Sequence, residues 1–303
     1  MAAPHPSTAE QGMTGDQTWT GDAALSRNDW LLREARRAPW LVWLSVWLLL
    51  VAVWAAIAPQ TLAPYSPLET NLLNTLAPPS WQHWLGTDEI GRDLFSRIVY
   101  GARESLSIGL LAMLIAMLLA APLGFLAALA PPLVRNTADR FIEVLLSFPT
   151  LLVALLFVTI LGQSPLNVAI AVGIGSAPGY ARLIRGQTLL VRTSAYVEAA
   201  VALGHSRARV LWQHVVPNVI RPLIPVTGLG IGKSVVWSSS LSFLGLGVKP
   251  PSSEWGALLA AGKSQLLEAP WLMVVPGTAV VLVALSFSTL FSYIQARSEG
   301  ART

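Results

Sequence analysis

Few side chains in this sequence have the types and spacing that catalysis or metal binding requires. The chain has no cysteine, which excludes disulfides, thiolate metal sites and cysteine nucleophiles together. The histidines are too scattered for a metal site of recognisable spacing; they are His5, His83, His205 and His214. No constellation of serines or carboxylates indicates a catalytic centre. The sequence therefore predicts no catalytic residue and no metal site, and we expect that the chain is not an enzyme.

The segment TGLGIGKS, at 227–234, is close to a phosphate-binding loop. That motif requires a glycine at the first position, where Thr227 stands, and it should follow a strand of a soluble domain. Here the segment lies in an apolar run, where small residues favour close packing between helices. We therefore expect no nucleotide site, and no cofactor, in this chain.

Lys233 is the one charge deep inside an apolar stretch. A lysine at the centre of a bilayer costs about 2.5–3.5 kcal/mol on insertion scales, so it should face a bundle interior or an aqueous path. Two interpretations stay open. Lys233, with Ser238 nearby, lines a substrate path, or its side chain snorkels or pairs structurally.

The composition indicates a membrane protein. The 303 residues are 53% hydrophobic and 12% charged, whereas an average soluble domain is about 25% charged. A soluble domain would need more charges to cover its surface. Residues 1–38 differ, because they are rich in Gly, Ser, Thr and Pro without an apolar period, and we expect a disordered cytoplasmic tail there. Signal-peptide cleavage at Ala56-Ile57-Ala58 is the disfavoured alternative.

Six apolar segments are long enough to cross a bilayer. Backbone groups in lipid must be satisfied within the segment, so such runs are expected to be helices and the fold class to be all-α and polytopic. We expect a first transmembrane helix at 39–58, an outer segment at 59–104, a core of five helices at 105–295 and a cytoplasmic tail at 296–303. The individual spans are predicted at about 40–58, 106–129, 141–162, 165–183, 218–246 and 270–294.

The positive residues are distributed unevenly between the two sides of this predicted membrane. With a cytoplasmic amino terminus, fourteen of the 20 Lys and Arg residues fall on the inner side, five fall on the outer side, and Lys233 lies within a span. The positive-inside rule therefore predicts that both termini are cytoplasmic.

The segment 184–217, between the fourth and fifth predicted spans, is predicted to form two short cytoplasmic helices that meet at Gly204. Ser194 can cap the first helix, and Glu198 then falls in its first turn, where the helix dipole favours a carboxylate. Glycine suits the position just past a helix end. Pro217 is expected to end the second helix.

The first of these two helices is predicted to present one face to a partner. Four residues at helical spacing share that face: Tyr196, Ala199, Ala200 and Leu203. The two alanines let another surface approach closely, so the helix suits a groove on a soluble protein. An ordinary amphipathic loop helix is the alternative. Ser206 is expected to cap the second helix.

The sequence Glu198-Ala199-Ala200, followed by Gly204 and later by Val216-Pro217, resembles the EAA loop of permease subunits from ATP-binding-cassette (ABC) importers. Two longer stretches resemble signatures of the DppC/OppC type, the dipeptide, oligopeptide and nickel permeases. They are LGTDEIGRDLFSRIVYGARESLSIG at 85–109 and LSFLGLGVKPPSSEWGAL at 241–258. The resemblance extends over about residues 35–285.

This resemblance implies a type I ABC importer permease fold in a bacterial inner membrane. It implies that the chain forms half of a translocation pathway for peptides or a related small solute, and that the loop docks into a cleft of an ATP-hydrolysing subunit. The implied partners are a second permease, two ATPase subunits that use the ATP, a solute-binding protein and the lipid bilayer, without nucleic acid. The coupling residues carried over are Glu198, Ala199, Ala200, Gly204 and Pro217.

The charged residues that precede the second predicted span have two possible roles. Thr87 or Asp88 can cap a short helix of about 89–100 at the outer membrane surface. Asp88, Arg92 and Asp93 either contact a delivered substrate or its carrier protein, or pair locally and hold the outer mouth. Local pairing is the favoured interpretation.

The chain departs from the family pattern at two places. Family members often carry a glutamate a few residues before LSFLGLG, where this chain has Ser238-Ser239-Ser240, with Lys233 upstream. A basic lining would favour anionic groups over amines, which we state as a hypothesis. The usual polar end of the last span is replaced by FSTLFSYIQA at 287–296, so the cargo (dipeptide, oligopeptide, nickel or another solute) stays open.

A secondary transporter without an ATPase is the alternative function. Such a protein needs acids or histidines within its spans for ion coupling. The predicted spans have none at their centres, so the sequence favours the ATP-driven importer.

Overall fold

The computed structural model describes residues 39–300, and the tail predicted at 1–38 and the last three residues lie outside that range. The described chain is built from helices and contains no strand; its one extended pairing is an isolated bridge between Thr87 and Asp93. The predicted all-α class is therefore confirmed.

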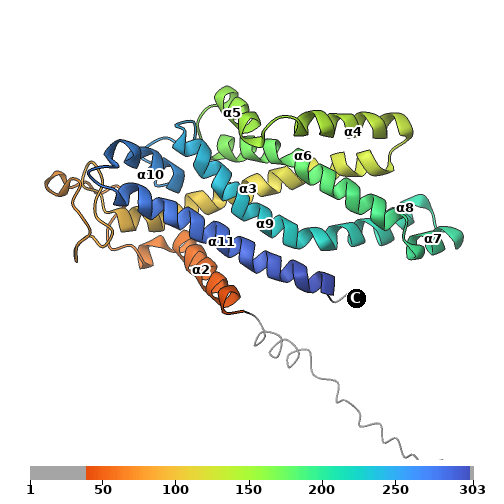
Figure 1. Cartoon of the computed structure of the whole chain (residues 1–303), viewed down its shortest axis with the longest axis horizontal. Coiled ribbons are helices and arrows are strands. Elements are labelled where there is room, and N and C mark those ends of the chain that lie inside the picture. Colours follow the sequence, from red (N-terminus) through yellow and green to blue (C-terminus); the bar gives the residue numbers. More distant parts are fainter. Residues whose placement is uncertain (1–38, 301–303) are drawn as a thin grey trace, which may run out of the picture. The chain divides into compact units, whose positions relative to one another are not determined.

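The helices follow one another along the chain from α2 to α11 (Figure 1). They are α2 (Trp40–Ile57), α3 (Leu94–Leu129), α4 (Pro132–Leu146), α5 (Thr150–Leu161), α6 (Pro165–Arg192), α7 (Ala195–Ala202), α8 (Arg207–Val210), α9 (Val216–Phe243), α10 (Trp255–Gly262) and α11 (Trp271–Gly300). Short 3-10 turns lie at Pro59–Thr61, Leu72–Asn74 and Lys263–Gln265, and a π turn lies at Leu211–Val215.

Within residues 39–300, four helical stretches are long and apolar enough to cross a membrane: α2, α3, the stretch Arg207–Phe243 and α11. The bent pair α4–α5 would add a fifth crossing. The predicted span 165–183 lies in α6, which has 28 residues but carries Arg182, Arg185 and Arg192 in its second half. The sixth crossing therefore stays a prediction.

The predicted span 141–162 is wrong as a single helix. α4 ends at Leu146, α5 begins at Thr150, and the two helices differ in direction by 90°. Pro149 explains the break, because a residue before proline is pushed out of the helical region and proline cannot donate to the preceding turn. The chain thus bends just where one crossing was expected.

The separate outer helix predicted at about 89–100 is also wrong. α3 begins at Leu94 and continues without interruption to Leu129, so the predicted short helix is the first part of a 36-residue helix. Asp93, rather than Thr87 or Asp88, is the N-cap, and its side chain accepts a hydrogen bond from the Ser96 amide.

Small residues bring α3 and α6 together. Each helix buries a stripe of small residues at every fourth position: Ala112, Ala116, Ala120 and Gly124 on α3, and Ala169, Gly173, Ala177 and Ala181 on α6. A Cβ atom added at Gly173 would lie 2.9 Å from the Ala112 carbonyl oxygen. Between helices in lipid, such close approach replaces the hydrophobic effect as the source of packing energy.

The remaining helices place two functional regions at opposite ends of this helical unit (Figure 1). α6 and α9 lead to α7 and α8 at one end, whereas α10 and the segment before α3 lie at the other. At the second end, Arg97 donates to the Ser252 carbonyl oxygen and the Trp255 indole donates to the Ile98 carbonyl oxygen.

Candidate functional site

The segment from α7 to the π turn, here called the elbow (residues 193–215), connects α6 to α9. Ser194 stands at the predicted N-cap position of α7, but its hydroxyl donates back to the Val191 carbonyl oxygen at 2.6 Å instead of accepting from the helix. The Ser194 carbonyl oxygen accepts from the Glu198 amide. Glu198 is exposed in the first turn of α7, where its carboxylate is stabilised by the helix dipole.

The two sides of α7 have different surroundings. Val197 and Ala200 are buried, and they belong to the same core cluster as Ile184 of α6 and Val219 of α9. Ala200 therefore does not share an exposed face with Ala199, which corrects that part of the prediction. Tyr196 and Leu203, the latter 77% exposed, are left uncovered by the described chain on the outward side, and Val201 is left uncovered next to Val197.

Gly204 ends α7 in the manner predicted. Its φ of +80° lies in the left-handed region, which glycine adopts without a steric penalty. The His205 amide then donates to the Ala200 carbonyl oxygen at 3.2 Å, closing the helix end. Nothing lies within 4 Å of the position a Cβ would take. Backbone conformation, rather than crowding, is therefore what requires glycine here.

From Arg207 the chain stays helical all the way into α9. Ser206 caps α8 as predicted, accepting from the Arg209 amide at 3.3 Å. The prediction that Pro217 stops the second helix is wrong, because Pro217 lies in the first turn of α9. A proline inside a helix lacks the amide donor and presses on the carbonyl four residues earlier. The wider π turn at Leu211–Val215, directly before it, accommodates this misfit.

A cavity of about 770 Å³ lies beside the elbow. Its lining includes Glu198, His205 and Arg207 together with the end of α3 at Leu129. The His205 ring stacks on that of His214, with 6.0 Å between ring centroids. No group of three or more potential metal ligands occurs within residues 39–300.

At the opposite end, the predicted outer-mouth carboxylate Asp88 pairs locally. Its Oδ2 accepts from Arg97 Nη1 at 2.6 Å and from Arg92 Nε at 2.7 Å. Asp88 Oδ1 accepts from the amides of Ile90 and Arg92. Both Asp88 and Arg97 are buried, so this network holds the start of α3 rather than presenting free charges.

The Asp93 carboxylate is also held by local contacts at this end of the protein. Its Oδ2 accepts from the Ser96 amide at 2.8 Å and from the Ser96 hydroxyl at 2.7 Å. His83 Nδ1 lies 3.0 Å from Asp93 Oδ1. Asp88 and Asp93 are therefore parts of the scaffold of this end, and the local-pairing interpretation describes their contacts.

Glu254 is a buried residue that sequence reasoning did not single out. It caps α10, with Oε1 accepting from the Gly256 amide at 2.9 Å and Oε2 from the Ala257 amide at 2.8 Å. The Ser239 hydroxyl donates to Oε1 from α9. Burial raises the pKa of the Glu254 carboxyl, although the hydrogen bonds from these donors act in the opposite direction. A lone acid followed by a helical run was the available sequence signal.

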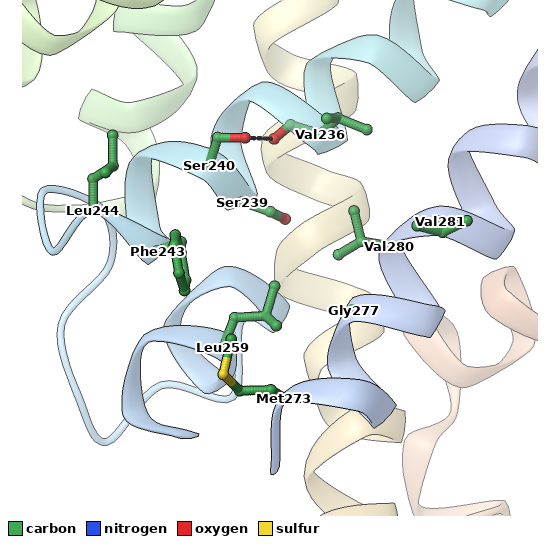
Figure 2. Close-up of a pocket in the computed structure, with 10 residues that line it drawn as sticks. All are labelled: Val236, Ser239, Ser240, Phe243, Leu244, Leu259, Met273, Gly277, Val280 and Val281. Carbon is green, nitrogen blue, oxygen red and sulfur yellow. Dashed lines mark hydrogen bonds between the residues drawn. The ribbon is translucent and has the colours of Figure 1, made fainter. Parts of the chain in front are cut away.

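The structure separates the two predicted pathway residues of α9. Lys233 is exposed, whereas Ser238 is buried and donates to the Val235 carbonyl oxygen at 3.0 Å. A pocket of about 430 Å³ lies between α9, α10 and α11, and its first lining residue on α9 is Val236. Figure 2 shows the side chains that line it. Ser239 and Ser240 are its polar members, and its walls include Leu259 and Val280.

The comparison with protein families decides the identity of this helical unit. The family described as binding-protein-dependent transport system inner membrane component matches residues 120–300, which include the elbow, α9 and α11. The chain belongs to this family. It is a multi-pass protein of the bacterial inner membrane and a permease subunit of an ABC importer.

Curated relatives narrow the type of permease to DppC/OppC. The dipeptide transport system permease protein DppC of Alkalihalophilus pseudofirmus is 37% identical over 242 residues, covering 80% of this chain and 78% of that protein. The glutathione transport system permease protein GsiD of Pectobacterium atrosepticum is 38% identical over 246 residues, covering 80% of each chain. The probable D,D-dipeptide transport system permease protein DdpC of Escherichia coli is 36% identical over 259 residues, covering 86% of each.

Solved structures give the fold of the permease. The inward-facing MetNI methionine ABC transporter matches with a TM-score of 0.54 and 18% identity, covering 68% of this chain and 96% of that chain. An amino acid ABC transporter crystallised with histidines matches with a TM-score of 0.52 and 20% identity, covering 66% and 94%. The permease therefore has the fold of type I ABC importers, and transporters of this class work with an ATPase and a binding protein.

Proposed function

We infer that this permease forms half of a translocation pathway for a peptide or a related small solute, and that the elbow receives work from separate ATPase subunits. One observation carries the inference. α7 buries Val197 and Ala200 in the protein core while it leaves Tyr196, Val201 and Leu203 uncovered. A short helix that is fixed on one side and apolar on the other is suited to docking.

The buried side of α7 explains how a displacement of this helix would be transmitted to the membrane helices. Val197 and Ala200 share a core cluster with Ile184 of α6 and Val219 of α9. A displacement of α7 would therefore move two long helices together, since packed cores do not deform continuously. Closure of the ATPase subunits would in this way reset the pathway between inward-open and outward-open states. The residues proposed to take part in this coupling are Glu198, Ala199, Ala200, Gly204 and Pro217.

The orientation of the chain follows from the same proposal. The elbow would lie in the cytoplasm with both termini, and the Asp88–Arg97 network would lie outside, where the solute-binding protein docks. Arg182, Arg185, Arg192, Arg207 and Arg209 flank or lie in the elbow, in agreement with the positive-inside rule. A second, similar permease would complete the pathway, and two ATPase subunits, not this chain, would bind ATP.

The cargo is proposed from the relatives. Their names refer to dipeptides, D,D-dipeptides and glutathione, which are all small peptides with free carboxylates. We take a small peptide as the first cargo to test.

The test is ATP-dependent uptake by the complete importer in proteoliposomes, with Leu203→Asp as the variant. Leu203 is 77% exposed on the outward side of α7, so an added charge should disrupt docking without disturbing the core. The ATPase should no longer co-purify, and uptake should fall at least about tenfold, the equivalent of roughly 1.4 kcal/mol.

The matched control is Leu190→Asp. Leu190 is 68% exposed near the end of α6 but lies outside α7, so the ATPase should stay bound. Uptake that persists without the ATPase, or equal loss in both variants, would overturn the proposal in favour of a secondary transporter or a different docking surface.

A further inference from the structure

Lys233 lies on an exposed face of α9 without a partner of its own. The residue is exposed, and within residues 39–300 it takes part in no hydrogen bond or ion pair. α9 runs from Val216 to Phe243, so Lys233 is well inside the helix.

The sequence supplies no counter-ion for Lys233 from the same part of the chain. No Asp or Glu occurs between Glu198 in the elbow and Glu254 at the start of α10. Glu254 is already committed to capping α10. The apolar stretch 271–298 of α11 contains no acid either. Neither α9 nor the stretch 271–298 of α11 therefore provides an acid that could balance the charge of Lys233.

The acyl chains of lipid do not stabilise the charged ammonium group of Lys233. An exposed lysine well inside a span is costly in lipid. The ten residues from Lys233 to Phe243 correspond to about 15 Å along the helix axis, which is further than a lysine side chain extends. The Lys233 ammonium therefore does not reach past the end of α9, which favours a face of α9 that meets water or another protein chain.

An apolar pocket continues the same face of α9. Val236 and Ser240 lie three and seven residues after Lys233, so all three share one side of the helix. Val236 and Ser240 also line the pocket of about 430 Å³ in Figure 2. This volume is within the range of small-molecule sites, about 300–1,000 Å³. Lys233 thus lies about one helical turn before the first pocket residue of α9, Val236, and is not itself part of the lining. The two serine hydroxyls at the pocket donate to Glu254 and to the Val236 carbonyl oxygen.

We propose that Lys233 and the α9–α11 pocket form a cargo subsite for an amphipathic organic anion. The ammonium group of Lys233 pairs with a carboxylate of the cargo, and an apolar side chain of the cargo enters the pocket. The inference rests on the proposed function, because it requires this face of α9 to line the pathway. It adds the chemical class of the cargo: peptides with a free carboxylate are preferred over the same peptides with a neutral end.

The first test is the aqueous accessibility of position 233 in the complete importer. The chain has no cysteine, so the variant Lys233→Cys carries a single thiol, and its modification by an anionic methanethiosulfonate reagent can be read as a mass shift of this chain. The matched control is Leu114→Cys, 54% exposed on α3. Its neighbour Met113 packs close to Gly230 of α9, which puts Leu114 at a similar depth.

The thiol at position 233 should react at least about tenfold faster than the thiol at position 114. Equal rates, or no reaction at position 233, would overturn the proposal, because the face would then be in lipid or sealed in a protein interface. This measurement does not depend on the natural cargo.

The second test is selectivity, measured as ATP-dependent uptake of alanyl-phenylalanine and of its C-terminal amide. Lys233→Met should lower uptake of the acid about tenfold and leave uptake of the amide unchanged, whereas Lys233→Arg should keep the preference for the acid. Equal effects on both probes would mean that Lys233 pairs with an acid of a partner subunit. Uptake that needs no ATP would instead refute the importer function itself.

Discussion

Single residues at the two ends of the permease hold local structure by different means. Gly204 provides a left-handed backbone at the end of α7. Asp88 provides the negative charge that two arginines share at the start of α3. The first role is conformational and the second is electrostatic, so substitutions should have separable effects.

Gly204→Ala should loosen the elbow. An L-residue in the left-handed region costs roughly 1–2 kcal/mol, and the space around Gly204 is open, so strain is the only cost. Hydrogen exchange at the His205 amide should accelerate about fivefold or more. Gly186→Ala is the control, because Gly186 also has open space but no positive φ. Equal exchange in the two variants would contradict the conformational role.

Asp88→Ala should destabilise the end of the permease at which α3 begins. Arg97, with a side chain 4% exposed, would be left as an uncompensated buried charge, which costs about 3–5 kcal/mol. The thermal unfolding temperature in detergent should fall clearly. Glu89→Ala should have little effect, because Glu89 makes one exposed contact, with Ser264. An unchanged unfolding temperature for Asp88→Ala would show that the network adds no stability.

Sequence rules identified local features of the elbow, but they did not reveal that its second helix continues into α9. Glu198, Gly204 and Ser206 stand where dipole and capping rules predict, because these rules depend on neighbours in sequence. Pro217 does not end its helix, because the π turn before it has no signature among those rules. The burial of Ala200 depends on α6 and α9, which one helical period cannot reveal.

The pair α3–α6 is the element on which the described core depends most. Its small-residue stripes let the two backbones approach, and no large side chain could substitute for them. The spacing of alanine and glycine at every fourth position is readable in the sequence. Which helix faces which is not readable, because both stripes fit any helix with a matching groove.

Gly173→Ala tests this close approach. The added Cβ would lie 2.7 Å from Ile115 Cγ2 and 2.9 Å from the Ala112 carbonyl oxygen, so overpacking should cost about 1–3 kcal/mol. Gly179→Ala, in the same helix with nothing within 4 Å, should be neutral or stabilising by up to about 1 kcal/mol. Thermal unfolding of the two variants in parallel distinguishes them, and identical behaviour would argue against tight α3–α6 packing.

The break between α4 and α5 shows why apolar runs alone misplace elements. Residues 141–162 read as one span because they lack charge apart from Glu143. Pro149 nevertheless bends the chain by 90°. The proline was the available signal, but hydropathy carries no information on direction.

At the scale of the whole molecule, α6 and α9 join the elbow to the opposite end of the helical unit (Figure 1). The elbow is packed into the core through Val197 and Ala200, and the opposite end is tied together by the Asp88–Arg97 and Arg97–Ser252 contacts. Mechanical work applied at the elbow can therefore change the structure of the opposite end only by moving the helices that join them, such as α6 and α9. This is the physical basis of the proposed coupling.

The most direct test of this coupling is the labelling of one thiol on the elbow. Leu203→Cys introduces a single thiol into a chain without cysteine, at a position 77% exposed. A membrane-impermeant maleimide should label it in inside-out vesicles that lack the ATPase, should not label it in right-side-out vesicles, and should be blocked when the ATPase is bound. Labelling from the outer side, or labelling that the bound ATPase leaves unchanged, would contradict the account.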